Sequence, residues 1–387
     1  MSVRHQQGYI WRKADGWYGR WCQDVVVDGR IVRKQQAKKL ADYNDRYRSK
    51  KDVRSLLDEI LKPINEGKVS PSSTLTVAEF VGSFYLPYAQ ENCKPSTYSA
   101  YKTQWQMYLA AKLAKIVMRD FRTADAAKLL GDVHREHGLG RTTLRHLKAF
   151  MSSVFTFAIN QGVLDGYNPV RLAQIPNKAA APKETPHATP EKVLAMLDVL
   201  EKAGKQKARA AVALMFFAGL RPGEGRGATW EDYDGKQLMV RRSIWGTHAT
   251  EPKTVESSKP VPIIEPLRSI LAELREGDLN PASGPILRGP SGKPLHLDNL
   301  ARREIRPALK GAGIPWHGWY ALRRGIATLL NSIEKDPMAA KGLLRHTSVA
   351  TTQKHYIKEV PAITLAAMKK IEVLCNQYAP VEEVLPA

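Results

Sequence analysis

The segment at residues 316–325, WHGWYALRRG, places a histidine, a tyrosine and two adjacent arginines among aromatic residues. Guanidinium groups donate paired hydrogen bonds to phosphate oxygens, and they keep their charge at neutral pH. These residue types at this spacing could therefore form a phosphate-binding site. The segment could equally be the start of an amphipathic helix with a basic face, so the rest of the chain has to decide between the two interpretations.

The net charge favours a polyanionic partner. The 387 residues include 59 Lys plus Arg against 38 Asp plus Glu, which gives a net charge of +21. The excess is +7 in residues 1–70, +6 in residues 71–180 and +8 in residues 181–387, so every part of the chain is basic. A protein that contacts a nucleic-acid duplex along its whole length would have this distribution. The alternative is a basic charge that serves solubility alone.

The composition disfavours membrane, secreted and disulfide-rich proteins. No run of about 18 apolar residues is present, which argues against a membrane span. Charged residues occupy the N-terminal stretch where a signal peptide would need an apolar core, so we expect a protein that is not secreted. Cys22, Cys93 and Cys375 lie far apart without CxxC spacing. This pattern is unlike a disulfide framework or a zinc ribbon, and it fits a reducing cytoplasm.

Residues 1–70 are predicted to form a small β-sheet followed by a helix. The turn signals ADG and DG separate aromatic and β-branched runs, as in a meander of short strands. Residues 37–67 have helical apolar spacing, which stops at Pro63 or Gly67. Ten basic and three acidic residues lie in residues 30–54, so this region is a candidate DNA-binding surface.

Residues 75–175 are predicted to form a compact four-helix bundle, and residues 176–188 a linker without apolar periodicity. A capping box at Thr76 opens the first helix. Pro95 suits the first turn of the second helix, and Thr123 can cap the third. A long fourth helix completes the bundle.

Residues 189–378 are predicted to form a mixed α+β unit, and residues 379–387 a tail. A nearly all-apolar helix comes early in this unit, and two strands then flank a loop. Further helices are predicted near residues 265–276, 298–310, 320–333, 338–345 and 362–377. The fold class is thus multidomain, mainly α with small β-sheets.

Five short segments of this last unit occur in a particular order: AGLRPGEGRGATWEDYD (218–234), EPKTVESSKPVPI (251–263), WHGWYALRRGIATLL (316–330), LLRHTSVATT (343–352) and HYIK (355–358). Their order, spacing and residue types resemble the tyrosine recombinase family, also called phage-type integrases. The resemblance implies a catalytic domain here and a core-binding domain in the helical bundle. It also implies an arm-site-binding domain in the N-terminal sheet and helix.

The resemblance implies a nucleophile and groups that bind and protonate a phosphodiester. Tyr356 matches the nucleophile, and a tyrosine hydroxyl suits this role because it forms a phosphotyrosine that a DNA hydroxyl can later attack. Arg221 and Arg323 match the arginines that bind the non-bridging phosphate oxygens. Lys253 matches the general acid for the leaving 5′-oxygen, with Lys259 as its competitor.

Two further matches and one departure complete the predicted site. His346 matches a position that hydrogen-bonds a phosphate oxygen, and Glu224 matches the acidic residue that orients arginine or backbone. The family's H-x-x-R is here Tyr320-Ala-Leu-Arg323. We expect Tyr320 to donate a hydrogen bond to the phosphate in place of the imidazole, with a weaker acid–base role. His317 could reach the pocket only if the helix begins by then.

Other basic residues are predicted to contact DNA: Lys34, Lys38, Lys39, Arg145, Lys148 and Arg324. The last of these contacts a backbone phosphate or packs within the protein. No metal or other cofactor is expected, since His317, His346 and His355 lack the spacing of a zinc site.

The function implied by the resemblance is a site-specific DNA recombinase, a phage or genomic-island integrase. It would cleave and rejoin DNA through a 3′-phosphotyrosine and a Holliday junction, without metal or ATP. The implied partners are double-stranded DNA at core and arm attachment sites, a homo-tetramer of this chain, and host DNA-bending and excision factors. The implied location is the nucleoid, in the cytoplasm of a bacterial host.

Two other functions stay open at this point. A catalytically degenerate DNA-binding protein with an architectural or regulatory role is favoured by the departure at Tyr320 alone. A type IB topoisomerase-like enzyme that nicks and religates DNA would share the chemistry. The helix near residues 362–377 could dock onto a neighbouring protomer, as is frequent in the family, or close its own domain.

Overall fold

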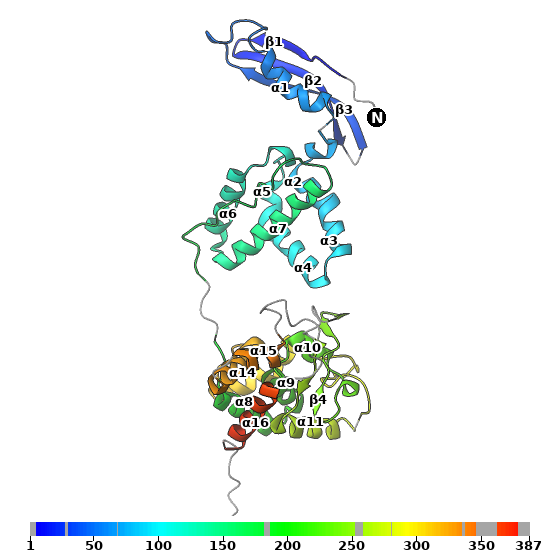
Figure 1. Cartoon of the computed structure of the whole chain (residues 1–387), viewed down its shortest axis with the longest axis vertical. Coiled ribbons are helices and arrows are strands. Elements are labelled where there is room, and N and C mark those ends of the chain that lie inside the picture. Colours follow the sequence, from blue (N-terminus) through cyan, green and yellow to red (C-terminus); the bar gives the residue numbers. More distant parts are fainter. Residues whose placement is uncertain are drawn as a thin grey trace, which may run out of the picture. The chain divides into compact units, whose positions relative to one another are not determined.

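The computed structural model describes residues 5–27, 30–67, 69–181, 186–251, 258–279, 281–334, 337–345 and 362–377. The chain divides into two compact units, Met1–Lys183 and Glu184–Ala387 (Figure 1). Among the described residues, helices predominate and the strands form small sheets, which confirms the predicted mainly helical class. No helix in this part of the chain is long and apolar enough to span a membrane.

The first unit begins with a three-stranded antiparallel sheet in the order β1-β2-β3. Its elements are β1 (Tyr9–Lys13), β2 (Gly16–Val27) and β3 (Arg30–Ala41), and helix α1 (Arg54–Asn65) follows. Side chains alternate between the two faces of a strand. Ile10, Trp17 and Trp21 consequently lie on the face that packs against Leu57 and Leu61 of α1, and together they form a small core.

The opposite face of this sheet carries aromatic and basic side chains. Trp11 and Tyr18 pair across β1 and β2, and their ring centroids lie 5.6 Å apart. The Lys13 ammonium lies 4.9 Å from the centroid of the Tyr18 ring. Of the aromatic residues near the N-terminus, some therefore build the core while others line the partly exposed face.

The helix predicted from residue 37 onward is wrong at its start. Residues 37–41 belong to β3, which pairs with β2 along nearly its whole length, and α1 begins only at Arg54. Strand conformation is decided by the neighbouring strand more than by local apolar spacing, because cross-strand pairs supply the stabilisation. The helix ends at Asn65, and Pro63 lies in its last turn.

A helical bundle completes the first unit. Its α-helices are α2 (Val77–Phe80), α3 (Leu86–Asn92), α4 (Pro95–Gln104), α5 (Ala110–Leu113), α6 (Thr123–His137) and α7 (Arg141–Asn160). π-Helical turns at Val81–Tyr85 and Trp105–Leu109 join α2 to α3 and α4 to α5, and short 3-10 helices lie at Pro71–Thr74 and Met118–Asp120. The capping box at Thr76 and the start of α4 at Pro95 are confirmed. Arg122 rather than Thr123 occupies the N-cap of α6.

The second unit contains a larger hydrophobic core. Its α-helices are α8 (Pro190–Lys202), α9 (Gln206–Phe217), α10 (Pro222–Gly227), α11 (Glu265–Gly277), α12 (Leu297–Leu300), α13 (Arg306–Gly311), α14 (Trp319–Glu334), α15 (Pro337–Leu344) and α16 (Ala362–Gln377). Its strands pair as β4 (Gln237–Leu238) with β7 (Val261–Pro262), and β5 (Ser243–Trp245) with β6 (His248–Thr250). A 3-10 helix at Trp230–Asp232 and a π-helical turn at Ala301–Ile305 complete the set.

Helix α9 lies at the centre of this core. Nine of its twelve residues are buried, and it packs against α8, α11 and α14, as expected for a mostly apolar helix. Helix α16 packs against α11, α14 and α15 of its own chain. The Glu372 carboxylate on α16 accepts a hydrogen bond from the backbone N–H of Glu265 at 3.1 Å. In this structure, then, α16 closes its own domain.

Candidate functional site

A sharp turn after α9 positions Arg221. Helix α9 ends at Phe217, and α10 begins at Pro222. Between them Gly219 has a φ of +56°, in the left-handed region that glycine adopts most easily, and an added Cβ would lie 2.9 Å from a methyl carbon of Leu344. Arg221 is the N-cap residue of α10. The turn thus separates Arg221 from the buried helix that precedes it.

We expect Gly219→Ala to lower the free energy of unfolding by about 2 kcal/mol, because alanine is strained at this φ and its Cβ contacts Leu344. Gly204→Ala is the matched control, since Gly204 has a similar φ of +64° but open space around an added Cβ. Urea denaturation of both variants measures the difference. Equal losses in the two variants would show that the contact with Leu344 costs nothing.

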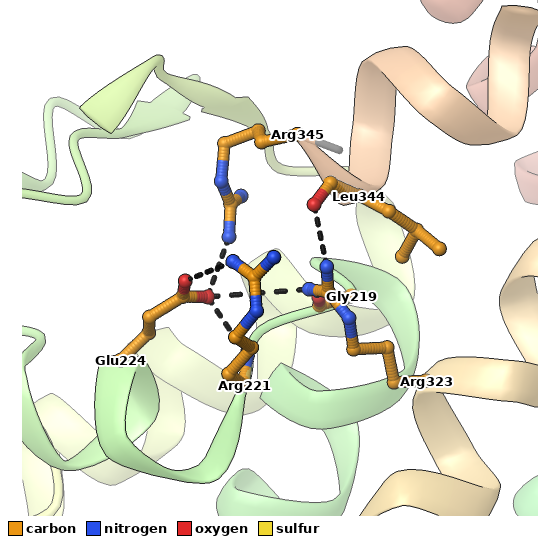
Figure 2. Close-up of polar contacts among 6 residues, drawn as sticks. All are labelled: Gly219, Arg221, Glu224, Arg323, Leu344 and Arg345. Carbon is orange, nitrogen blue, oxygen red and sulfur yellow. Dashed lines mark hydrogen bonds and ion pairs between the residues drawn. The ribbon is translucent and has the colours of Figure 1, made fainter. Parts of the chain in front are cut away.

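Glu224 is the centre of a buried cluster of charges, and only 3% of its side chain is exposed. Arg221 donates to it twice, from the backbone N–H to Oε2 at 2.8 Å and from Nη1 to Oε1 at 2.6 Å. Nη2 of Arg345 donates to Oε2 at 2.6 Å, and Nη1 of Arg323 lies 4.0 Å from the same oxygen. Figure 2 shows the three guanidinium groups converging on this one carboxylate.

Arg323 joins the two segments that carry the other arginines. It lies on α14, and 5% of its side chain is exposed. Its Nη1 donates to the carbonyl oxygen of Gly219, and its Nη2 donates to the carbonyl oxygen of Leu344 (Figure 2). Because Gly219 comes just before Arg221 and Leu344 just before Arg345, this one guanidinium fixes both segments relative to each other.

The electrostatics of the cluster favour binding of an anion. Burial raises the pKa of the Glu224 carboxyl, but Arg345 and Arg221 outweigh this effect and hold the pKa below its ordinary value. Burial, together with the neighbouring charge of Arg221, lowers the pKa of Arg323 to about 9. Burial also lowers the pKa of Arg345. At neutral pH the cluster has three cations around one carboxylate, so a phosphate group would be a suitable further counter-ion.

Arg226 attaches the β5–β6 hairpin to α10. Its Nη1 donates to the carbonyl oxygen of Ile244 at 3.2 Å, and its Nη2 donates to that of Gly246 at 2.9 Å. Its Nε donates to the carbonyl oxygen of Leu295 at 2.9 Å. The hairpin therefore has a fixed position beside α10, whose N-cap residue is Arg221.

The structure brings three of the predicted site residues together, namely Arg221, Glu224 and Arg323. The other predicted residues of the reaction lie outside the described residues: Lys253, His346 and Tyr356. Tyr320 lies one helical turn before Arg323 and is 54% exposed. His317 is exposed and precedes α14, which begins at Trp319. The helix does not begin by His317, so the condition under which His317 would replace the family's histidine is not met.

The lysines predicted to contact DNA lie on β3. Lys34 and Lys38 are exposed. Lys39 forms ion pairs with Asp15 at 3.2 Å and with Asp42 at 2.8 Å. A phosphate would therefore compete with these two carboxylates for Lys39.

The other predicted DNA contacts have different surroundings. On α7, Arg145 is exposed and Lys148 is half-buried. The Nε of Arg324 donates to the carbonyl oxygen of Pro186 at 2.9 Å, which attaches the segment before α8 to α14. Arg324 thus has a structural contact within its own unit.

Sequence reasoning missed two arginines of this site, Arg345 and Arg226. The only signal for Arg345 was its position directly before His346 in LLRH. Arg226 belongs to the glycine-rich GEGRG segment, and its three carbonyl partners lie on segments that follow it in the chain. Neither set of contacts could be inferred from local spacing.

Known proteins are similar to the part of the chain that contains this cluster. The sequence profile described as "Phage integrase family" matches residues 187–361. A tyrosine recombinase XerC-like protein of Caldanaerobacter subterraneus subsp. tengcongensis is 23% identical over 86% of this chain and 90% of its own length. Tyrosine recombinase XerC of Methylobacterium sp. is 29% identical over 72% of this chain and 88% of its own length.

Solved structures share the fold. A lambda integrase tetramer bound to a Holliday junction has a TM-score of 0.56 at 18% identity, and the match covers 90% of this chain and 98% of the other. The Tn1549 transposon integrase in complex with a circular intermediate DNA has a TM-score of 0.59 at 17% identity, covering 77% of this chain and 99% of the other. Residues 187–361, the segment that contains Arg221, Glu224, Arg323 and Arg345, therefore match the catalytic domain of the tyrosine recombinase, or phage integrase, family, and the solved structures share the fold of most of the chain.

Proposed function

We propose that the protein is a site-specific DNA integrase that uses Tyr356 as its nucleophile. The observation that carries the proposal is the arginine cluster: Arg221 and Arg323, distant in the sequence, lie around one buried carboxylate in the catalytic domain. Such fixed, paired donors suit the non-bridging oxygens of a phosphodiester, on which charge develops during displacement.

The reaction would proceed in two balanced displacements. The Tyr356 hydroxyl gives its proton to solvent as its oxygen attacks the scissile phosphorus, the bond from phosphorus to the 5′-oxygen breaks, and Lys253 donates a proton to the departing 5′-oxygen. The 5′-hydroxyl of the partner strand then attacks the 3′-phosphotyrosine and releases the tyrosine hydroxyl. Arg221 and Arg323 hold the phosphate oxygens in both steps, and His346 adds a hydrogen bond. The phosphotyrosine retains the bond energy, so we expect no need for metal or ATP.

The domain organisation that we propose follows the family. Residues 1–70 would bind arm sites through the sheet, residues 75–175 would bind core sites, residues 189–378 would catalyse, residues 176–188 would link these units and residues 379–387 would form a tail. Lambda integrase binds a core site as a dimer and a Holliday junction as a tetramer, and we propose the same assembly for this chain. Phage or genomic-island DNA would be the substrate, in the nucleoid of a bacterial host, with host DNA-bending and excision factors as partners.

A suicide substrate tests this function. Duplexes that cover the DNA flanking the gene, each nicked near the candidate cleavage site, would trap the phosphotyrosine because the short cleaved strand diffuses away. We expect a covalent adduct with wild-type protein and none with Tyr356→Phe. Failure of the wild-type protein to form an adduct on any of these duplexes would favour a DNA-binding protein without catalysis. Adducts without strand exchange between two duplexes would favour a nicking and religating enzyme.

The same substrate tests the departure at Tyr320. We expect Tyr320→Phe to slow adduct formation roughly tenfold, because a hydrogen bond from its hydroxyl to the charged phosphate is lost. Tyr320→His should stay close to the wild-type rate, since an imidazole can donate the same bond. A wild-type rate for Tyr320→Phe would show that the hydroxyl does not contact the phosphate.

A further inference from the structure

Arg345 is the most deeply buried arginine of the charge cluster. None of its side chain is exposed, whereas 33% of the Arg221 side chain is. It directly follows α15, and its guanidinium points toward Glu224 and Arg221 (Figure 2). Buried guanidinium groups are costly unless they are paired and hydrogen-bonded. Its position therefore calls for partners that satisfy its donors.

Only part of this guanidinium is satisfied within the described residues. Nη2 donates to the Glu224 carboxylate at 2.6 Å. Nε and Nη1 are buried and have no hydrogen-bond partner there. An orphaned buried donor in a native structure points to an acceptor that binds at that place. The unsatisfied atoms of Arg345 are N–H donors on a cation, so the acceptor they fit is an anionic oxygen.

The charge balance of the cluster leads to the same ligand. One carboxylate, that of Glu224, is shared by Arg221, Arg323 and Arg345, which leaves two positive charges in excess among these four side chains. Glu224 also accepts the backbone N–H of Arg221, so its oxygens are already well occupied. A non-bridging phosphate oxygen would reduce the excess charge and accept the remaining hydrogens of Arg345.

The backbone at Arg345 adds an independent observation. Its φ is +53°, in the left-handed region that non-glycine residues rarely adopt. Glycine would take this conformation without strain. Arg323 contributes to holding the segment in place, because its Nη2 donates to the carbonyl oxygen of Leu344, the preceding residue. A strained backbone at an arginine is typical of a functional position, and here the arginine belongs to a cluster with an excess of positive charge.

We propose that Arg345 is a third phosphate-binding arginine of the catalytic site, whose Nε and Nη1 donate to a non-bridging oxygen of the scissile phosphate while Nη2 stays on Glu224. The inference rests on the proposed function, and it adds a residue to that reaction. It also explains why Glu224 is buried between arginines. The carboxylate orients Arg221 on one side and Arg345 on the other, so that both guanidinium groups can donate hydrogen bonds to the same phosphate.

The test compares two substrates of the full-length protein in single-turnover cleavage. One is the nicked phosphodiester substrate, and the other carries a methylphosphonate at the scissile position, tested as separate diastereomers. The methylphosphonate replaces one charged oxygen by a methyl group, so an arginine that serves that oxygen has nothing to bind. We expect Arg345→Met to slow cleavage of the phosphodiester roughly 100-fold. On one methylphosphonate diastereomer, Arg345→Met should cleave at a rate within about threefold of the wild-type rate on the same substrate.

Two further variants separate this role from a structural one. Arg345→Gly removes the side chain and suits the backbone conformation, so it should fold and show the same dependence on the substrate. Arg209→Met is the matched control, since Arg209 also bridges carboxylates in this unit, those of Glu201 and Glu273, and should cleave both substrates at wild-type rates. Equal losses on both substrates for the Arg345 variants, or no loss on either, would overturn the inference. Absence of any wild-type adduct would instead overturn the proposed function, and the inference with it.

Discussion

Glu224→Gln should lower the free energy of unfolding by about 3–5 kcal/mol. The substitution keeps the size of the side chain and removes the negative charge that Arg221, Arg323 and Arg345 share. Three guanidinium groups would then lie close together without the carboxylate that they share. Chemical denaturation of the full chain at neutral pH measures this change.

Glu273→Gln is the matched control for this substitution. Glu273 also pairs with an arginine, Arg209, but 47% of its side chain is exposed to solvent. Screening by water makes such a pair worth less than about 1 kcal/mol. A loss of stability in Glu224→Gln no larger than that in Glu273→Gln would contradict the central role of the buried carboxylate.

The effect of Glu224→Gln should depend on pH in a defined direction. The pKa of Glu224 in the folded protein lies below its ordinary value of 4.5. Its contribution to stability is therefore fully present above that value, and it is lost as the pH falls below 4.5 through the folded-state pKa. The difference between wild type and variant should be constant from neutral pH to about 5 and should shrink at lower pH. A difference that widens on acidification would have the wrong sign.

Arg323→Lys should slow formation of the covalent DNA adduct roughly 100- to 1,000-fold. Lysine keeps the positive charge, but its ammonium cannot reproduce the planar fork with which Arg323 holds the carbonyl oxygens of Gly219 and Leu344. Loss of either bond would release the turn before Arg221 or the segment before Arg345. Single-turnover cleavage of the nicked substrate measures the rate.

Arg209→Lys controls for the loss of an arginine that bridges two acceptors. Arg209 contacts Glu201 and Glu273 near the start of α9, whereas Arg221 follows the other end of that helix. We expect this variant to cleave at the wild-type rate. If the cleavage rate of Arg323→Lys lay within about threefold of the wild-type rate, the guanidinium of Arg323 would not be required to hold the segments of Gly219 and Leu344.

Local rules predicted much of the helical part of the fold. The capping box at Thr76 and the start of α4 at Pro95 depend on a few adjacent residues, so the sequence alone was sufficient. The apolar run at α9 predicted a buried helix, because a helix that is apolar on all sides has to be buried. The segment at residues 37–41 was different. Its helical spacing was overridden by pairing with β2, which lies earlier in the chain.

The candidate site could be predicted only in part. The motifs gave Arg221, Glu224 and Arg323, and the structure places them in one cluster. Arg345 was not predicted, since its ion pair with Glu224 spans 121 residues and its buried, left-handed conformation has no signature in the sequence. For Tyr320, the sequence identified the departure from the family motif, and the structure adds an exposed position one turn before Arg323.

The position of the covalent bond tests the central claim most directly. The adduct with the nicked substrate would be digested with trypsin, and the peptide attached to the DNA would be identified by mass spectrometry. Trypsin cleaves after lysine and arginine, so Tyr356 lies in the peptide of residues 355–358, HYIK, and Tyr320 lies in the peptide of residues 311–323. We predict that the DNA is attached to Tyr356. Attachment to Tyr320, or to any other residue, would contradict the account.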